Sequence, residues 1–314
     1  MERFSFIGRR LLQAVPVILA VLAATFLLLK LVPGDPAIAV AGPRATPAAI
    51  AAVRRDMGLD QPVWTQFGNY LHRVVRGDLG DSAVSGVPVT ELLRQNGPVT
   101  LWVLITGSLV AIGIAVPCAL VAARRPGSAG DQVVRIGSLF GLTVPPFWVG
   151  IMLLSFVAAR TGWFPIGGWP ASSTDRLRTV ALPAITLGIA VSPVLIRSLR
   201  TSLIEVFNAD HVISARAAGI EGWTLTRRFV LRNSFVPTVA LLATTVAYLL
   251  FGTVLVEATF GLPGLGQTMV QASVSRDFSV VQGLTLVFAL GTIIVNLIGD
   301  LALTMLDPRI RVSS

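Results

Sequence analysis

Charged residues are scarce in this chain. They make up 13% of its 314 residues, whereas a soluble domain carries about 25%. Hydrophobic residues account for 54% and the mean hydropathy is +0.76, which excludes an ordinary cytosolic enzyme and indicates a membrane protein. The 25 basic residues outnumber the 16 acidic ones, and in such a chain we assign this excess to loops beside the membrane rather than to a nucleic-acid interface.

Residues that carry chemistry are also few. The single cysteine, Cys118, excludes an intrachain disulfide framework, and two distant histidines, His72 and His211, argue against a histidine metal cluster. The only lysine, Lys30, is followed by Leu31, so the sequence has no phosphate loop ending in Gly-Lys-Ser/Thr. His-Glu-x-x-His and Gly-x-Ser-x-Gly motifs are missing too. We therefore predict no catalytic residue, metal or cofactor in this chain, and any ATP that its function uses would have to be hydrolysed by another chain.

Long apolar runs dominate what is present. A bilayer core about 30 Å thick needs roughly 20 apolar residues per helix. The first run has 22 residues, which exceeds the usual signal-peptide core of about 7–15, so we expect it to be retained as a span. Six such runs predict an all-α membrane protein with six transmembrane helices: Leu11–Val32, Val99–Ala123, Val133–Ala159, Thr179–Ile204, Asn233–Glu257 and Val280–Leu306.

The distribution of arginine predicts the orientation. With the N-terminus inside, thirteen arginines flank the cytoplasmic ends of the runs and four lie in the short outer loops. Cytoplasmic loops are enriched in arginine and lysine, whereas segments beyond about 60 residues cross largely regardless of charge. We expect a multi-pass membrane protein with both termini in the cytoplasm.

Two segments outside the spans are large enough to have a function. Residues 33–98 are predicted to form an outer helical subdomain, in which Thr46 caps a helix that runs to Met57. Residues 205–232 form an inner loop, with helix-forming residues that end at Gly219, where a C-cap is expected. The predicted organisation is the N-terminus and first span in 1–32, the outer subdomain in 33–98, a five-helix core with the inner loop in 99–306, and a cytoplasmic tail in 307–314.

The inner loop carries a specific pattern. His211–Gly219, followed by Trp223–Pro237, resembles the cytoplasmic loop of the permeases of ATP-binding-cassette (ABC) importers. In that family a Glu-Ala-Ala triplet precedes the glycine by six residues. Here the corresponding residues are Ile213, Ser214 and Ala215, so the glutamate is missing. The Leu-Arg-Asn ending and the later proline resemble the dipeptide, oligopeptide and nickel branch, where that glutamate is commonly replaced.

Further blocks resemble the same branch, so that the resemblance covers nearly the whole chain in register. The long outer segment is similar to that of the first of the two permease subunits in such importers. The matching blocks are Phe26–Ala37, Gly58–Val63, Arg76–Ser82, Phe260–Gly266 and Leu306–Arg311.

The resemblance implies an ABC importer permease fold and a set of partners. These are a homologous second permease, two ATPase subunits or domains, and an extracytoplasmic substrate-binding (lipo)protein. The chain would form half of the path by which di- and oligopeptides cross the membrane, and it would break no covalent bond.

The resemblance also implies that the inner loop enters a groove of an ATPase. We expect Gly219 to be left-handed or tightly packed, as glycine commonly is at a helix C-terminus. An interfacial helix that lies on anionic lipid through Arg216, Arg227 and Arg228 is the alternative. The residues predicted for coupling are His211, Val212, Ser214, Ala215, Arg216, Ala217, Gly219, Glu221 and Trp223.

Prolines within the predicted spans include Pro117 in the second run, the pair Pro145 and Pro146 in the third, and Pro193 in the fourth. Pro145, Pro146 and Pro193 each remove a helix hydrogen bond and favour a kink, so they are candidates for a pore hinge, with simple packing as the alternative. Gly137 and Gly141 are spaced for close helix contact, which we interpret as packing.

Polar residues within the predicted spans are few and costly unless they face protein or water. Asn296 and Asp300 lie one turn apart on the last run. We expect Asp300 to pair with an inner arginine and Asn296 to make a polar helix contact. Lys30 and Glu257 lie near the outer boundary, where snorkelling would let them reach water.

Two other classes of protein compete with a permease subunit. An ion-coupled secondary transporter is disfavoured because the spans contain no row of acidic residues and the sequence has no internal repeat. An intramembrane enzyme would need a catalytic constellation, which the sequence lacks. For the cargo, nickel chelates, opines and haem remain alternatives to peptides, because the external binding protein often selects the cargo of such importers.

Overall fold

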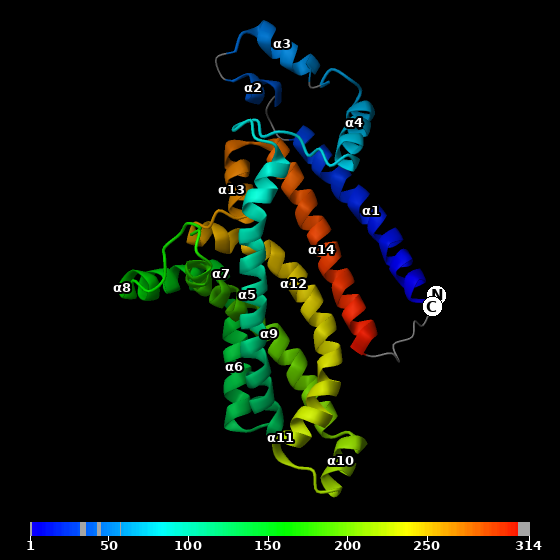
Figure 1. Cartoon of the computed structure of the whole chain (residues 1–314), viewed down its shortest axis with the longest axis vertical. Helices are drawn as coiled ribbons and strands as arrows, with labels where there is room; N and C mark the ends of the chain where they lie inside the picture. The colour runs from blue at the N-terminus through cyan, green and yellow to red at the C-terminus, as the bar shows by residue number, and fades with distance from the viewer. Residues whose placement is uncertain (1, 32–35, 43–44, 57, 307–314) are drawn as a thin grey trace. The chain divides into compact units, whose positions relative to one another are not determined.

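The computed structural model describes residues 2–31, 36–42, 45–56 and 58–306, and within these ranges the chain is almost entirely helical (Figure 1). The one β pairing that they contain is an isolated bridge between Asp81 and Pro88. In chain order the elements, with two π-helical segments labelled η, are α1 Glu2–Leu31, α2 Pro36–Ala41, α3 Pro47–Asp56, α4 Val63–Val75, α5 Val89–Arg124, α6 Ala129–Thr143, α7 Pro146–Leu153, η1 Leu154–Ala158, α8 Ala159–Thr161, α9 Ser173–Phe207, α10 Asp210–Ala217, α11 Gly222–Leu225, η2 Thr226–Leu231, α12 Arg232–Phe260, α13 Leu265–Ser275 and α14 Phe278–Leu306.

The chain divides into two compact units, each made of two stretches of sequence. Unit 1 contains residues 1–100 and 263–293, and unit 2 contains residues 101–262 and 294–314. The predicted tail and the Leu306–Arg311 block extend beyond the described residues.

Four helices are long and apolar enough to cross a membrane: α5, α9, and parts of α12 and α14. α6 and the following segment from α7 to α8 pass the same test when they are taken together, but the two segments are bent by 97° relative to each other. Within α1 the residues whose side chains the structure describes include the apolar stretch Leu12–Leu27. The predicted all-helical class is confirmed. Of the six predicted spans, four are continuous helices, the third is a broken helix, and the first lies within α1.

The break between α6 and α7 follows from two successive prolines. A residue before proline is disfavoured in the helical region, because the proline ring clashes with it. Val144 accordingly has φ −84° and ψ 123°, and Pro145, which itself precedes Pro146, has φ −62° and ψ 136°. Two consecutive extended residues end α6 at Thr143. The predicted kink is therefore a right-angled corner.

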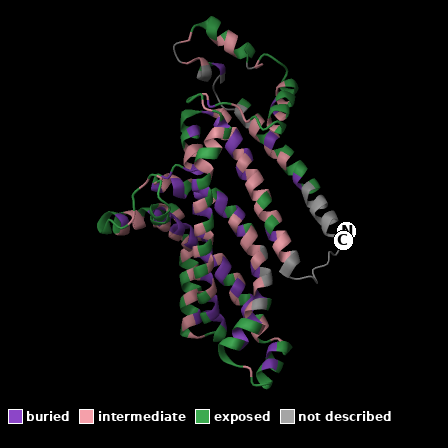
Figure 2. Cartoon of the chain, in the orientation of Figure 1, coloured by how far each residue is buried: buried purple, intermediate pink, exposed green. Residues whose placement is uncertain are grey.

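α9 is the central helix of unit 2. In its apolar window 72% of the residues are buried, against 39% for α5 and 39% for α12, and Figure 2 shows the dense burial along it. The helix continues through Pro183 and Pro193. Its long apolar side chains, among them Leu187, Leu195 and Leu199, fill the space between the neighbouring helices.

Small residues bring the helices of unit 2 close together. A Cβ atom added to Gly107 of α5 would lie 3.0 Å from Leu187 Cβ, and one added to Gly188 of α9 would lie 3.1 Å from the backbone nitrogen of Ala111. A Cβ atom on Gly299 of α14 would overlap Ala243 of α12. Association in lipid depends on such close backbone approach.

In unit 1 an aromatic cluster joins α1 to α4. The ring centroids of Phe26 and Phe67 are 5.3 Å apart, and those of Phe26 and Tyr70 are 6.1 Å apart. Leu22 of α1 and Leu286 of α14 are buried in the same cluster. Lys30 is exposed near the end of α1, where its ammonium hydrogen-bonds Gln66 of α4.

The outer segment is helical, but its boundaries differ from the predicted ones. Thr46 Oγ1 accepts a hydrogen bond from the Ala49 amide at 3.3 Å, as expected of the cap of α3, while Met57 lies outside the described residues. Helices that were not predicted include α2 and α4, which precede and follow α3, and α13, which lies between α12 and α14. α5 begins at Val89, ten residues before the predicted span, because its first turns extend beyond the apolar run.

Glu257 corrects a second expectation. Glu257 is 0% exposed, so it does not reach water by snorkelling. A glutamate is too short to extend from this position past the side chains that pack around it, and burial of the carboxyl group within protein is the alternative that the fold adopts.

Candidate functional site

The inner loop leaves α9 through a short capped turn. The Asn208 side-chain amide donates a hydrogen bond to the carbonyl of Ile204 at 3.0 Å, which satisfies one of the carbonyls left free at a helix end. Ala209 is extended, with φ −74° and ψ 146°, and is the N-cap of α10. The chain therefore reverses into a second, short helix within three residues of the end of α9.

Gly219 ends this second helix in the left-handed conformation. Its φ is +80°, and no atom would lie within 4 Å of an added Cβ atom. The Ile220 amide donates to the carbonyl of Ala215 at 3.0 Å, and the Gly219 amide donates to that of Arg216 at 2.9 Å. These reversed bonds are typical of a glycine C-cap. Of the two expected possibilities the left-handed one is confirmed, and the position is open rather than tightly packed.

A hydrophobic cluster holds the inner loop against the spans. Its members come from α5, α9, α10, α11 and η2, so that the loop and the ends of two long helices form one packed body. Val212 and Ala215, both predicted for coupling, point into this cluster and support the loop from within. The cluster consists of Ala119, Leu120, Ala123, Leu199, Leu203, Val212, Ala215, Leu225 and Val230.

The opposite side of the loop is exposed and partly apolar. Ile213 is 52% exposed and Trp223 is 57% exposed. Next to Trp223 lies an open cavity of about 540 Å³, lined by Arg124, Arg216, Glu221, Gly222, Trp223, Leu225 and Thr226. The other residues predicted for coupling, namely His211, Ser214, Ala217 and Gly219, are exposed as well. The loop thus offers a surface with an aromatic side chain, two basic groups and one acidic group.

Two polar contacts fix the flanks of this surface. His211 Nε2 lies 3.1 Å from the side-chain amide nitrogen of Asn233 at the start of α12. The guanidinium of Arg216 lies 5.9 Å from the ring centroid of Phe207, the last residue of α9, a distance typical of a cation–π contact. Both contacts link α10 to the ends of long helices.

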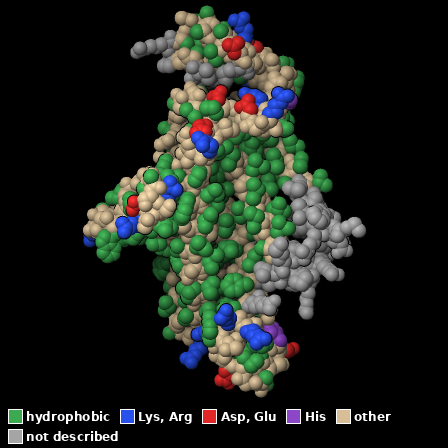
Figure 3. Space-filling view, in the orientation of Figure 1, with side chains coloured by type: hydrophobic (Ala, Val, Ile, Leu, Met, Phe, Trp, Pro, Cys, Tyr) green, Lys and Arg blue, Asp and Glu red, His purple; other side chains and the backbone are tan. Residues whose placement is uncertain are grey.

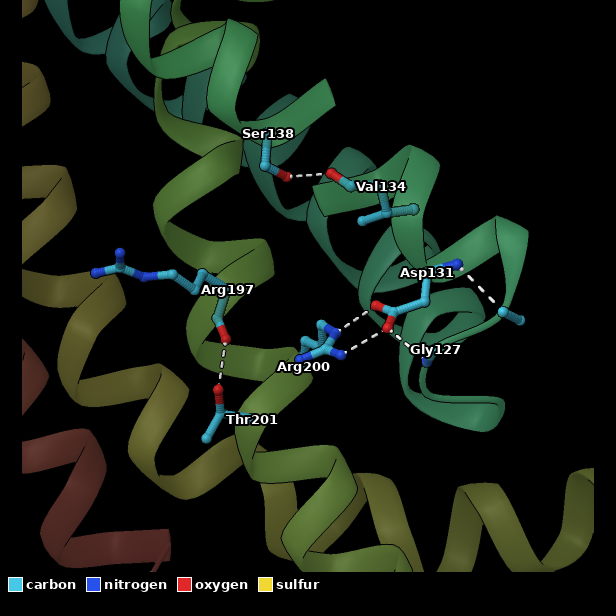
Figure 4. A network of polar contacts seen from close by, with 8 residues as sticks. Gly127, Asp131, Val134, Ser138, Arg197, Arg200 and Thr201 are labelled. Atoms are coloured by element: carbon cyan, nitrogen blue, oxygen red, sulfur yellow. Dashed lines mark hydrogen bonds and ion pairs between the residues drawn. The ribbon is translucent and has the colours of Figure 1, made fainter. Parts of the chain in front are cut away.

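A buried ion pair lies at the same end of unit 2, and sequence reasoning missed it. The carboxylate of Asp131 accepts hydrogen bonds from Arg200 Nε at 2.6 Å and Nη2 at 2.7 Å, and from the Gly127 amide at 2.9 Å. The Asp131 side chain is 1% exposed and that of Arg200 is 21% exposed. Figure 4 shows Arg197 on the other side of α9, pointing away from the pair. One signal was available, because Asp131 and Arg200 are opposite charges at the inner ends of neighbouring predicted spans.

The predicted hinge prolines lie in two places. Pro145 and Pro146 form the corner between α6 and α7, whereas Pro193 lies within α9. A Cβ atom added to Gly141 would lie 2.8 Å from Pro193 Cγ, while nothing lies within 4 Å of one added to Gly137. The contact between Gly141 and Pro193 therefore joins α6 to α9 one turn before the corner, and the packing role predicted for the glycine pair applies to Gly141 alone.

Asn296 and Asp300 lie in the part of α14 that belongs to unit 2, and both are half-buried. The pairing of Asp300 with an arginine stays a prediction. Across the described residues, no group of three or more His, Cys, Asp or Glu side chains is arranged to hold a metal ion.

These features define a helical protein with several membrane-spanning helices and a structured loop that connects α9 to α12. Residues 115–312 match the family described as "Binding-protein-dependent transport system inner membrane component", and residues 3–93 match its N-terminal family. The chain belongs to this family and is a permease subunit of an ABC importer.

Named relatives agree with this assignment over the full length. The chain is 35% identical over 307 residues to the "Glutathione transport system permease protein GsiC" of Salmonella choleraesuis, covering 98% of this chain and 99% of the relative. It is 34% identical over 310 residues to a "Putative peptide transport system permease protein" of Brucella abortus, with the same coverage.

Solved structures support the fold. Two crystal forms of the inward-facing MetNI methionine ABC transporter match with TM-scores of 0.58 and 0.57 at 17% identity. They cover 69% of this chain and 96% and 97% of the matched chains. The predicted ABC importer permease fold is thereby confirmed.

Proposed function

We propose that the chain is the first permease subunit of an ATP-driven importer of short peptides, and that residues 208–231 couple it to separate ATPase subunits. The membership in a family of binding-protein-dependent permeases supports the general assignment. The coupling role depends on the geometry of the loop.

The observation that carries the proposal is the shared core of the loop and the spans. Leu199 and Leu203 of α9, Ala119 of α5, and Val212 and Ala215 of α10 are buried in one cluster. Protein interiors are close-packed and transmit displacement. A force applied to the exposed side of α10 therefore moves the ends of α5 and α9 with it, instead of being absorbed by a flexible loop.

The exposed side of the loop suits a protein partner. Ile213 and Trp223 present apolar area, and Arg216 and Glu221 flank it with both signs of charge. Such a mixture of an aromatic centre and a polar rim is typical of protein interfaces. An interfacial helix on anionic lipid would expose a uniformly basic face, which the presence of Glu221 disfavours.

For the cargo we propose di- and oligopeptides, including glutathione-like peptides. Two relatives that cover nearly the whole chain are named for glutathione and for peptide transport. Nickel chelates, opines and haem are the alternatives to be tested. The direct measurement is the binding of each class to the substrate-binding protein encoded beside this permease.

The proposed assembly contains a homologous second permease, two ATPase subunits or domains and an extracytoplasmic binding protein. ATP and magnesium are bound by the ATPases, and this chain binds no cofactor. In the cytoplasmic membrane both termini and residues 208–231 face the cytoplasm, and residues 33–88 face outward.

Reconstitution tests the proposal. The complex in vesicles should import peptide only with ATP and loaded binding protein, and the purified single chain should hydrolyse no ATP. Uptake that persists without ATPase subunits and follows an ion gradient would instead support a secondary transporter.

A further inference from the structure

The chain between the proline corner and α9 returns to the end of α12. We call residues 146–169 the α7–α8 arm. Near its start, a Cβ atom added to Gly150 would lie 2.9 Å from Phe260 Cε2. Near its end, the Gly168 amide donates a hydrogen bond to the carbonyl of Gly261 at 3.2 Å. Gly261 is the C-cap of α12, so both contacts hold the arm where α12 ends, and Figure 1 shows α7 and α8 projecting away from α5, α6 and α9.

The end of α12 marks one boundary of the membrane. α12 starts next to the inner loop and has 29 residues, which amounts to about 43 Å of helix. At the largest usual tilt, about 40°, it still crosses a hydrocarbon core about 30 Å thick. Its last residue, Phe260, also ends the apolar span Leu241–Phe260. The arm therefore lies at the membrane–water boundary opposite the inner loop.

Tryptophan is concentrated in the arm. The chain has six tryptophans, and three of them, Trp148, Trp163 and Trp169, belong to the arm. Trp163 is 74% exposed and Trp148 is 50% exposed. Tryptophan is enriched at membrane–water boundaries, where its ring lies at the level of the lipid headgroups. The composition of the arm thus agrees with the level at which its contacts hold it.

The one charged residue of the arm lies beside an aromatic ring. The guanidinium of the exposed Arg160 is 4.9 Å from the ring centroid of Phe156, which is itself 53% exposed. An arginine in this setting keeps its aliphatic stem on apolar surface while its charged end reaches polar surroundings. Guanidinium groups bind phosphate oxygens through strong, often paired hydrogen bonds. Figure 3 shows hydrophobic and basic side chains together on this projection.

Positive charge predominates where the arm joins α9. From residue 146 to residue 178 the charged residues are Arg160, Asp175, Arg176 and Arg178. Arg176 supports the arm from within, because its guanidinium lies 5.3 Å from the ring centroid of Trp169. Arg178 is exposed, as Arg160 is. This excess of basic groups complements the charge of anionic lipid headgroups.

The two halves of the arm suit different surroundings. The first half packs against α9 and α12, with Gly150 buried and Ala158 2% exposed. Residues 162–172 contain no helix or strand, and irregular backbone that faces lipid does not occur within the hydrocarbon region. The end of the arm therefore needs the polar headgroup layer. Bulk water alone is a poor alternative, because exposed apolar patches generally mark contact with a membrane or another molecule.

We propose that the α7–α8 arm binds membrane phospholipid, with Phe156 and Trp163 at the boundary between headgroups and acyl chains and the Arg160 guanidinium on a lipid phosphate. Anionic phospholipid is the favoured occupant, because the segment carries three arginines and one aspartate. The inference requires a membrane-spanning chain and is independent of the cargo and of the coupling loop. Lipid bound in this way fixes the level of the proline corner and of the α12 end in the bilayer.

A spin-label depth measurement tests the placement of the arm. The importer complex, with Cys118→Ser and a nitroxide attached through Ile166→Cys, is reconstituted in vesicles of phosphatidylcholine and phosphatidylglycerol. Collisions with oxygen and with a water-soluble nickel complex should place this label at the level of the lipid phosphates. A label at Leu139→Cys is the control and should lie in the hydrocarbon, since Leu139 is 64% exposed on α6 and Ile166 is 66% exposed. An Ile166 label as deep as the control, fully accessible as in bulk water, or shielded from both reagents by protein would overturn the proposal.

Lipid cross-linking tests the role of Arg160. In phosphatidylcholine vesicles that contain a photoreactive phosphatidylglycerol, the lipid should label residues 146–172 of this chain in the assembled complex. Arg160→Gln should lower this labelling by about fivefold, the contribution of one arginine near an anionic membrane surface. Arg76→Gln, at an exposed position of the outer segment, should leave it unchanged. Equal labelling of the wild-type and Arg160→Gln complexes, or no labelling within residues 146–172, would contradict the proposal.

Discussion

Asp131 and Arg200 lie 69 residues apart in the sequence and form a two-pronged ion pair that ties the start of α6 to α9. The pair joins the same helix, α9, that carries the loop proposed for coupling. Because Asp131 is almost fully buried, the pair is sensitive to loss of either member.

Replacement of Arg200 by methionine should destabilise unit 2. It leaves the Asp131 carboxylate buried without its cationic partner, and loss of one member of a buried pair costs about 3–5 kcal/mol. The free energy of unfolding in detergent, from a denaturant titration, measures this. Arg197→Met is the matched control, because Arg197 is exposed on the far side of α9, and a surface change of this kind stays within about 0.5 kcal/mol. Equal losses in both variants would contradict the assigned role.

Gly141→Ala should weaken the contact between α6 and α9. The new methyl group would lie 2.8 Å from Pro193 Cγ, and such overpacking costs about 1–3 kcal/mol. The second change Pro193→Ala should restore part of the loss in a double-mutant cycle. Gly137→Ala, which meets no atom within 4 Å, should be neutral or stabilising, and a loss there as large as at Gly141 would disprove the contact.

Asp277 should keep the end of the outer segment ordered. Its side chain is 3% exposed, accepts a hydrogen bond from the Ala83 amide at 3.2 Å and is also bonded to the Ser82 hydroxyl. Asp277→Ala removes these bonds and a longer one from the Val84 amide at 3.5 Å, so amide hydrogen exchange in residues 82–86 should become at least about tenfold faster. Asp81→Ala, at an exposed position in the same segment, is the control. Unchanged exchange in the Asp277 variant would show that the segment is held by other contacts.

Two adjacent residues of α10 should separate support of the loop from docking. Val212 is 0% exposed and Ile213 is 52% exposed. Val212→Ala should lower the free energy of unfolding by about 1–3 kcal/mol through lost burial. Ile213→Ala should leave stability unchanged while reducing co-purification of the ATPase subunits. The reverse pattern would place the partner on the other side of the helix.

The sequence predicted the parts of the fold that depend on local patterns. Apolar run length located α5, α9, α12 and α14, and the glycine after a helix-forming stretch predicted the left-handed Gly219. Both features depend on neighbouring residues, so a single sequence contains them.

Features that depend on distant residues were missed. Run length cannot show that two prolines turn the third span by 97°, since it records no direction. α4 and α13 were missed because their sequences are less apolar than the spans. The burial of Glu257 and the pairing of Asp131 with Arg200 each depend on packing between helices, about which spacing along one chain says nothing.

The most direct test of the central claim compares two glycines of unit 2 that share the left-handed conformation. Gly219 has φ +80° and Gly127 has φ +81°, and no atom lies within 4 Å of an added Cβ atom at either position. A β-branched residue in this region of φ is strained by roughly 1–2 kcal/mol, so Gly219→Val and Gly127→Val impose a similar local cost, but only Gly219 lies in the loop proposed for coupling. We predict that stimulation of ATP hydrolysis by loaded binding protein in reconstituted vesicles is lost in Gly219→Val and retained in Gly127→Val, with both complexes fully assembled. Retained stimulation in Gly219→Val, or equal loss in both variants, would contradict the assignment of this loop as the element that couples the permease to its ATPases.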